Sequence, residues 1–231
     1  MPIPPDTLGQ IELLIFDLDG TLIDSEQDLA LSVNATLARM GRTLLPEDQI
    51  ASYVGQGVTV LVRRALGEGA SEEEVERGAA IFLDEYRAHM LDHTTPYPGV
   101  CKALEALLTR KLAVLTNKPV NFSRAILSGL GLDRYFFQVY GGNSFERKKP
   151  DPVGVLRLMA ESKAPASKTL MIGDSATDIL TGRNSGVWTC GVTYGLGGPS
   201  LLKEQPDLIV NDLRELSALL TGAPEPGGGL S

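Results

Sequence analysis

Short apolar runs of strand length alternate along the chain with segments whose apolar residues follow helical spacing. The runs are LLIF (13–16), LAVLTN (112–117), FFQVYGG (136–142), LMIGD (170–174), VWTCGVT (187–193) and LIV (208–210). A strand that is apolar on both sides is expected where helices cover both faces of a parallel sheet. Helical patterns occupy the intervening residues 99–110, 120–131, 151–161 and 178–186. We therefore predict an α/β fold with a doubly wound, Rossmann-like parallel sheet.

One long stretch interrupts this alternation. Residues 25–93 carry one helical pattern after another and no strand signal. Some ~70 residues far exceed a normal connection between a strand and a helix. We predict an inserted α-helical cap domain at 22–94, and an α/β core formed by 1–21 and 95–231. The linker DHTTPYPGV is typical of a defined chain reversal, and the polar residues 222–231 are expected to form a frayed tail.

Composition and charge exclude several classes of partner. The net charge of −8 disfavours nucleic acid and anionic membranes, because both require a basic face. No apolar run approaches the ~18 residues that cross a bilayer, so we expect no transmembrane helix. The start, MPIPPDTLGQ, has no basic segment followed by an apolar one, so we expect no secretory signal and a cytoplasmic protein. Cys101 and Cys190 lie far apart in apolar segments and are expected to be inert core residues.

Polar residues follow the apolar runs, and in an open parallel sheet the site lies at the carboxyl ends of the strands. The residues placed there are Asp17, Asp19, Thr116, Asn117, Asp174 and Asp178, joined by Lys148 and Lys149 of the RKKP segment. Carboxylates 4 Å apart repel by about 4 kcal/mol per pair at an effective dielectric constant of ~20. We therefore expect a divalent cation and a lysine ammonium among them. Mg²⁺ suits such oxygen ligands.

Each of these signals has a simpler interpretation when it stands alone. Asp19 with the following glycine is a common turn pair, and Asn117 or Asp174 would also suit a helix N-cap. The KKP segment would suit a solvated turn. All of them, however, follow predicted strands in one order, which favours a shared site.

The pair Asp17 and Asp19 suits covalent group transfer. Alternation along a strand puts both side chains on one side. A carboxylate nucleophile next to a second carboxylate, acting as general acid and then base, is a recognised arrangement. Gly20 lets the chain turn and lets backbone N–H groups approach an anion. Because phosphoryl transfer asks mainly for positioning and charge neutralisation, we predict this chemistry.

Four segments carry a resemblance to a known family. FDLDGTL, LTNK, KKPDP and GDSATDI, in this order, resemble the four motifs of the haloacid dehalogenase-like (HAD) hydrolase superfamily, which consists mostly of Mg²⁺-dependent phosphatases. The resemblance spans nearly the whole chain. The inserted helices resemble the α-helical cap of that family, and YVGQGVTVLVRRAL is similar to the phosphoglycolate phosphatases within it.

The resemblance implies a role for each motif residue. Asp17 would be the nucleophile that forms an aspartyl-phosphate, and Asp19 would protonate the leaving alcohol and then activate water. Thr116, with the Asn117 amide behind it, would hold a phosphoryl oxygen. Lys149 would balance the charge, with Lys148 as the less favoured alternative.

The resemblance also implies the metal ligands. Mg²⁺ would lie beside the carboxylates of Asp17 and Asp174 and the main-chain carbonyl oxygen of Asp19. Asp178 would bind the metal directly or orient its waters and Lys149. The second aspartate of the first motif, Asp19, is absent from the dehalogenase branch, so dehalogenation is disfavoured.

In the cap, Arg63 or Arg64 would suit a substrate carboxylate, because guanidinium matches its geometry. Adjacent residues on a helix point about 100° apart. At most one of them is expected to face the site, and Arg63 is favoured as a substrate-binding residue.

The sequence thus predicts a Mg²⁺-dependent phosphatase for a small phosphorylated metabolite, with 2-phosphoglycolate as the leading substrate, acting as a monomer or homodimer. Three other capped HAD enzymes stay open: a sugar-phosphate phosphatase, a pyrophosphatase and a phosphoglucomutase-like transferase. A non-catalytic regulator that binds a phosphorylated metabolite is the alternative from a different class.

Overall fold

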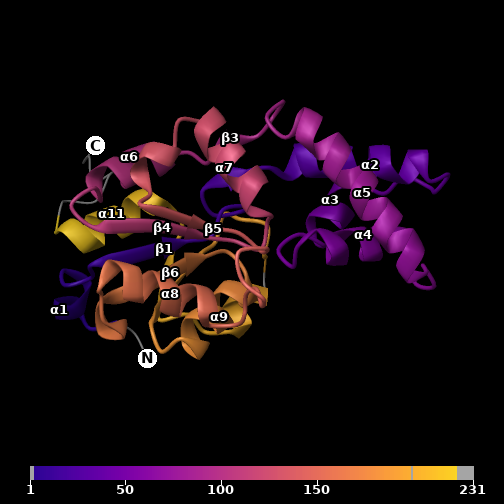
Figure 1. Cartoon of the computed structure of the whole chain (residues 1–231). Helices are drawn as coiled ribbons and strands as arrows, with labels where there is room; N and C mark the ends of the chain where they lie inside the picture. Colours follow the sequence, from indigo (N-terminus) through magenta and orange to yellow (C-terminus); the bar gives the residue numbers. More distant parts are fainter. Residues whose placement is uncertain (1–2, 199, 223–231) are drawn as a thin grey trace.

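An open sheet of six parallel strands forms the centre of the computed structural model, which describes residues 3–198 and 200–222 (Figure 1). The strands are β1 (Leu13–Phe16), β4 (Lys111–Leu115), β5 (Gln138–Tyr140), β6 (Thr169–Gly173), β7 (Trp188–Val192) and β8 (Leu208–Val210). Each of the six apolar runs overlaps one of them, and β4 and β6 begin one residue before the run. Their order is β5-β4-β1-β6-β7-β8, and every neighbouring pair is parallel, as predicted.

Helices cover both faces of this sheet (Figure 1). Those of the core are α1 (Pro5–Leu8), α6 (Val100–Ala106), α7 (Val120–Gly129), α8 (Val153–Ser162), α9 (Ala176–Asn184), α10 (Ser200–Lys203) and α11 (Leu213–Thr221), with short 3₁₀ turns at Asp133–Tyr135 and Ala166–Lys168. Strand β1 alternates between the two faces. Leu14 and Phe16 belong to the core cluster shared with α6, α7 and α11, whereas Leu13 and Ile15 pack with α8. All four are fully buried, so the predicted doubly wound fold is confirmed.

Strand β1 lies where the direction of the winding reverses. From β1 the chain adds β4 and β5 on one side and β6, β7 and β8 on the other. Loops that leave the carboxyl ends of neighbouring strands diverge at such a point and open a crevice. The residues that follow β1, β4 and β6 therefore meet there.

Four helices form a second lobe, which stands apart from the sheet (Figure 1). They are α2 (Glu26–Arg39), α3 (Glu47–Ala51), α4 (Val58–Leu66) and α5 (Glu72–His89). Helix α5 begins with a capping box, in which the Ser71 hydroxyl accepts from the Glu74 N–H (3.2 Å) and the Glu74 carboxylate accepts from the Ser71 N–H (2.9 Å). Buried apolar side chains such as Val33, Leu37 and Phe82 hold the lobe together.

The two connections between the lobes pair with each other. β2 (Ile23–Asp24) and β3 (Thr95–Pro96) form a short antiparallel ladder, which the sequence patterns do not reveal. The predicted limits of the insertion, 22–94, lie at this ladder. Two-residue strands are too short for an alternation pattern, so only the contact between two distant segments defines them.

Asp28, in the first turn of α2, ties the returning segment to the start of the cap. Its fully buried carboxylate accepts hydrogen bonds from the backbone N–H groups of His93 (3.0 Å) and Thr94 (2.8 Å) and from the Thr94 hydroxyl (2.7 Å). Burial alone would raise the pKa of Asp28, but the hydrogen bonds from Thr94 and His93 hold it below its usual value.

Three further expectations concern the remaining parts of the chain. Cys190 is buried as expected, but the expectation was wrong for Cys101, which is exposed because its position on α6 faces solvent. Within the described residues, no helix combines the length and apolarity needed to cross a membrane. Of the predicted tail, Gly222 ends α11, and residues 223–231 lie outside the described part of the chain.

Replacing Asp28 by alanine is expected to destabilise the protein by about 2–4 kcal/mol, because it leaves buried N–H and hydroxyl donors without an acceptor. Urea denaturation measures this loss. Asp84→Ala, which removes an exposed carboxylate paired with Arg87, is the control and should cost less than about 0.5 kcal/mol. Equal effects of the two substitutions would show that Asp28 does not anchor the returning segment.

Candidate active site

Asp17 is the first residue after β1 and is held rigidly at the edge of the sheet. Its backbone N–H donates to the Ile172 carbonyl oxygen on the neighbouring strand (2.9 Å). Its carboxylate oxygen Oδ1 accepts from the Leu18 N–H (2.7 Å), and the side chain is buried. Backbone and side chain are therefore both fixed.

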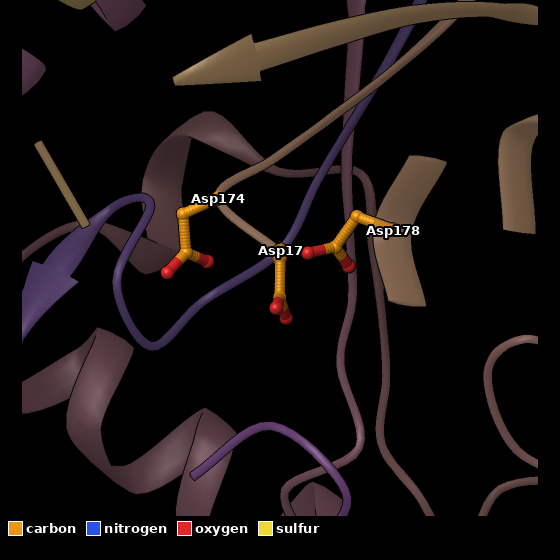
Figure 2. Close-up of side chains that lie close together, drawn as sticks. All are labelled: Asp17, Asp174 and Asp178. Atoms are coloured by element: carbon orange, nitrogen blue, oxygen red, sulfur yellow. The ribbon is translucent and has the colours of Figure 1, made fainter. Parts of the chain in front are cut away.

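Three carboxylates gather at this edge (Figure 2). Asp174 follows β6, Asp178 lies in the first turn of α9, and together with Asp17 they bring ligand oxygens within 4.8 Å of one another. All three residues are buried. Asp178 is oriented by Ser175, whose N–H (3.1 Å) and hydroxyl (2.6 Å) donate to its Oδ2 in a capping box. The same capping box thus starts helix α9 and orients the Asp178 carboxylate toward the other two.

Lys149 supplies the positive charge that the sequence leads us to expect. Its buried ammonium lies 2.9 Å from Asp17 Oδ1 and 2.6 Å from Asp178 Oδ1. Lys148 instead donates to the Gln56 carbonyl oxygen of the cap (2.9 Å) and is exposed. Of the two lysines, the structure therefore brings Lys149 to the carboxylates.

Asp174 receives no such ammonium among the described residues. Its carboxylate accepts from the Gly197 N–H (2.8 Å) and the Thr21 hydroxyl (3.3 Å). Burial, followed by the charges of Asp178 and Asp17, raises the pKa of Asp174 to about 8. Burial and the Asp178 charge likewise raise the pKa of Asp17 to about 7 against the opposing effect of Lys149.

The excess negative charge suits a divalent cation. One ammonium faces three buried carboxylates, so fully ionised groups would leave a net charge of about −2 in a medium of low dielectric constant. Gly20 preserves the approach to Asp174: its φ is +79°, and a Cβ there would lie 2.2 Å from Asp174 Oδ2. Carboxylate and carbonyl oxygens are hard ligands of the kind that Mg²⁺ prefers. The residues present therefore fit the predicted metal.

The Asp19 carboxylate lies apart from the cluster. Its oxygens accept from the ammonium of Lys118 at 2.8 and 2.9 Å and from the Ser25 hydroxyl at 2.6 Å. The sequence patterns did not single out Lys118, although they pointed to the two residues before it. A lysine three residues after a buried strand, at the edge where the site lies, is the signal that could have identified it.

Thr116 and Asn117 follow β4 and face the same crevice. Thr116 is buried, and its hydroxyl oxygen accepts from the Lys118 N–H (3.2 Å). The Asn117 amide donates to the Lys149 carbonyl oxygen (3.1 Å) and to the Gly55 carbonyl oxygen of the cap (3.0 Å). Pro119, not Asn117, occupies the N-cap position of α7, so the alternative interpretation of Asn117 as a helix cap was wrong.

A cavity of about 40 Å³, room for roughly three water molecules, lies between the sheet edge and the cap. The core lines it with Asp17, Asp19, Thr116 and Lys118 among others, and the cap with side chains that include Val54, Leu61, Phe82 and Tyr86. One end is therefore polar and the other largely apolar.

Arg63 does not reach this cavity. Its guanidinium forms two hydrogen bonds of 2.7 Å with the Glu72 carboxylate, and 41% of the side chain is exposed. It lines a separate surface hollow together with Arg64 and Gly67. The structure thus does not place Arg63 with the other predicted site residues, because a nearby acidic residue at the start of α5 pairs with it.

Comparison with known proteins gives concordant matches. The sequence model of the haloacid dehalogenase-like hydrolases matches residues 14–192. A phosphoglycolate phosphatase of Pseudomonas savastanoi pv. phaseolicola is 38% identical over 213 residues, which cover 89% of this chain and 78% of the relative. One of Vibrio parahaemolyticus is 39% identical over 221 residues, covering 91% and 96%.

A solved structure agrees over nearly the same length. The crystal structure of a predicted phosphoglycolate phosphatase from Haemophilus somnus superposes with a TM-score of 0.85 at 31% identity and covers 93% of this chain and 99% of that one. Because the coverage is nearly complete, the likeness includes the inserted helices as well as the sheet.

The acidic cluster predicts a specific dependence of stability on pH. Without metal, the folded protein keeps protons on Asp17 and Asp174 up to about pH 7 and 8, whereas an ordinary aspartate has a pKa of 3.8. The folded state then binds more protons than the unfolded state, so the metal-free protein should lose stability as the pH rises from about 4 through 8.

A Mg²⁺ ion held by this cluster would have to displace those protons, so its stabilising effect should grow between about pH 6 and 8.5. At a concentration a hundred times the dissociation constant it contributes about 2.7 kcal/mol, or a rise in Tm of about 5–10 °C. Calorimetric scans with Mg²⁺ or chelator measure the difference. Asp174→Asn is the control that should reduce it. A shift that is independent of pH would contradict the assignment of the cluster to a cation.

Proposed function

Since the chain belongs to the haloacid dehalogenase-like hydrolases and is a phosphoric monoester hydrolase, we propose that it hydrolyses 2-phosphoglycolate by a Mg²⁺-dependent double displacement on Asp17. The observation that carries this proposal is the setting of the Asp17 carboxylate. Leu18 and Lys149 both engage Oδ1, and no hydrogen bond from the described residues engages Oδ2. One oxygen is thus held and the other is available to attack.

In the first half-reaction, Asp17 Oδ2 attacks the phosphorus atom of the ester. A bond forms between this oxygen and phosphorus, and the bond from phosphorus to the ester oxygen breaks. Asp19 donates a proton to the departing alcohol oxygen. The product on the protein is an aspartyl-phosphate at Asp17.

The second half-reaction returns the protein to its starting state. Asp19, now ionised, accepts a proton from a water molecule, whose oxygen attacks the phosphorus atom. The bond between phosphorus and Asp17 breaks, and inorganic phosphate leaves. Over the full cycle, Asp19 regains its proton and Asp17 is freed of the phosphoryl group.

The remaining residues hold charge and geometry. Thr116 and Lys149 would donate to the phosphoryl oxygens, and Asn117 fixes the segment of Lys149 through its carbonyl oxygen. When bound by Asp17, Asp174 and Asp178, with the Asp19 carbonyl oxygen, Mg²⁺ would neutralise negative charge around the transferred group. Positioning and charge neutralisation are the main requirements of phosphoryl transfer.

The named relatives and the cavity both support 2-phosphoglycolate as the substrate. The relatives from Pseudomonas and Vibrio are named phosphoglycolate phosphatases. The cavity under the cap is small, and the cap contributes an apolar wall that would exclude bulk water around the reacting atoms. A small phosphorylated metabolite is the class of substrate that fits.

Asp17→Asn should lower kcat by at least about a thousandfold while the fold is retained, because the amide lacks the charge of the nucleophile. Phosphate release from 2-phosphoglycolate measures kcat, and circular dichroism checks the fold. Asp133→Asn, an exposed aspartate far from the site, is the matched control. If Asp17→Asn keeps a kcat within about tenfold of the wild-type value, Asp17 is not the nucleophile.

A panel of small phosphate esters assayed with Mg²⁺ and with chelator tests substrate and metal together. We expect 2-phosphoglycolate to have the highest kcat/KM and chelation to lower phosphate release by at least about a hundredfold. Full activity after chelation would refute the metal dependence. Isomerisation of a sugar phosphate without phosphate release would indicate a mutase.

A further inference from the structure

The polar end of the cavity contains a second buried ammonium, that of Lys118, which the reaction described above does not use. Only 6% of its side chain is exposed. Its ammonium lies 2.8 and 2.9 Å from the two oxygens of the Asp19 carboxylate, so the cavity holds a positive charge next to the proposed proton donor.

Tyr86 closes the cavity from the cap side over this charge. The Lys118 ammonium lies 4.6 Å from the centre of the Tyr86 ring, within the range of a cation–π contact. Tyr86 lies in α5, whereas Lys118 follows β4, so the contact joins the two lobes.

The Tyr86 hydroxyl is buried, and no residue in the described part of the chain accepts a hydrogen bond from it. Burial raises the pKa of Tyr86 to about 12, so its proton is retained at neutral pH. Buried polar groups without a partner are rare in proteins, and one in a cavity indicates a bound group that would satisfy it. An O–H donor beside an ammonium calls for an anionic acceptor.

We propose that Lys118 and Tyr86 form a subsite for the carboxylate of the substrate, so that the enzyme selects small phosphorylated acids over neutral phosphate esters. The proposal rests on the proposed function, because Asp19 must lie at the leaving oxygen for the two groups to be neighbours. Lys118 contacts the Asp19 carboxylate at 2.8 and 2.9 Å. In 2-phosphoglycolate a single methylene separates the carboxylate from the ester oxygen, which matches this short span.

The apolar part of the lining disfavours a sugar. Phe82, Leu61 and Phe122 line the cavity together with Tyr86 and carry no polar group for the hydroxyls of a sugar. The substrate carboxylate would share the charge of Lys118 with Asp19. It would contact Lys118 of the core and Tyr86 of the cap at the same time.

The test compares 2-phosphoglycolate with ethyl phosphate, in which a methyl group replaces the carboxylate. The measured quantity is the ratio of their kcat/KM values in the wild type, Lys118→Met and Tyr86→Phe. Lys168→Met is the matched control, since Lys168 pairs with Glu12 on the exposed surface.

We expect Lys118→Met to lower the ratio by about 10- to 100-fold, because a charged hydrogen bond to the carboxylate is lost. Most of this change should appear as weaker binding of the acid, seen as a higher KM. Tyr86→Phe should lower the ratio by about 2- to 10-fold, because only a neutral donor is removed. Lys168→Met should leave it unchanged. Circular dichroism checks each variant, and if Lys118→Met does not fold, the isosteric Tyr86→Phe decides.

The outcomes separate this inference from the proposed function. If the wild type releases phosphate from neither ester, the proposed function fails and the subsite with it. If it hydrolyses both with equal kcat/KM, the subsite alone is refuted. A ratio unchanged in Lys118→Met and Tyr86→Phe, even with both rates reduced, would show that Lys118 acts only by positioning Asp19.

Discussion

The contact of the Lys149 ammonium with the carboxylates of Asp17 and Asp178 is the interaction on which the rest of the site depends. Three carboxylates crowd a buried edge of the sheet, and their mutual repulsion would drive protons onto them or open the fold. Lys149 fixes one oxygen of Asp17 and leaves the other available. It also leaves Asp174 without a cationic partner among the described residues, where a metal would fit. The proposed nucleophile, the proposed metal site and the expected pH response thus share one electrostatic origin.

Much of the fold and part of the site could be predicted from the sequence. The strands were recognisable because burial on both faces makes them continuous apolar runs, as in β1 and β6. Asp17 and Asp174 follow such strands, so the topology alone brings them together. The contacts that escaped prediction depend on side-chain direction or on distant partners. Lys118 turns inward to Asp19, Arg63 turns outward to Glu72, and the β2–β3 ladder joins segments about 70 residues apart in sequence.

The cap is joined to the reaction centre by polar contacts from several directions. Asn117 donates to the Gly55 carbonyl oxygen, Lys148 to that of Gln56, and Asp28 holds the returning segment at the base of the cap. Each of these hydrogen bonds contributes little to stability on its own, because water competes for the same groups. The contact of Lys118 with Tyr86 also joins the two lobes. The proposed substrate selection and the exclusion of water would then depend on the same closed arrangement.

The central claim is that the phosphoryl group passes through Asp17. The most direct measurement traps the protein during turnover with Asp19→Asn, which lacks both the acid of the first half-reaction and the base of the second. The variant is mixed with Mg²⁺ and p-nitrophenyl phosphate, whose leaving group departs without a proton, then quenched in acid and mapped by peptide mass spectrometry. We expect one added phosphoryl group on the peptide that contains Asp17, and none when Asp17 is also replaced by Asn. A phosphoryl group on another residue, or phosphate release with no labelled protein at any time point, would contradict it.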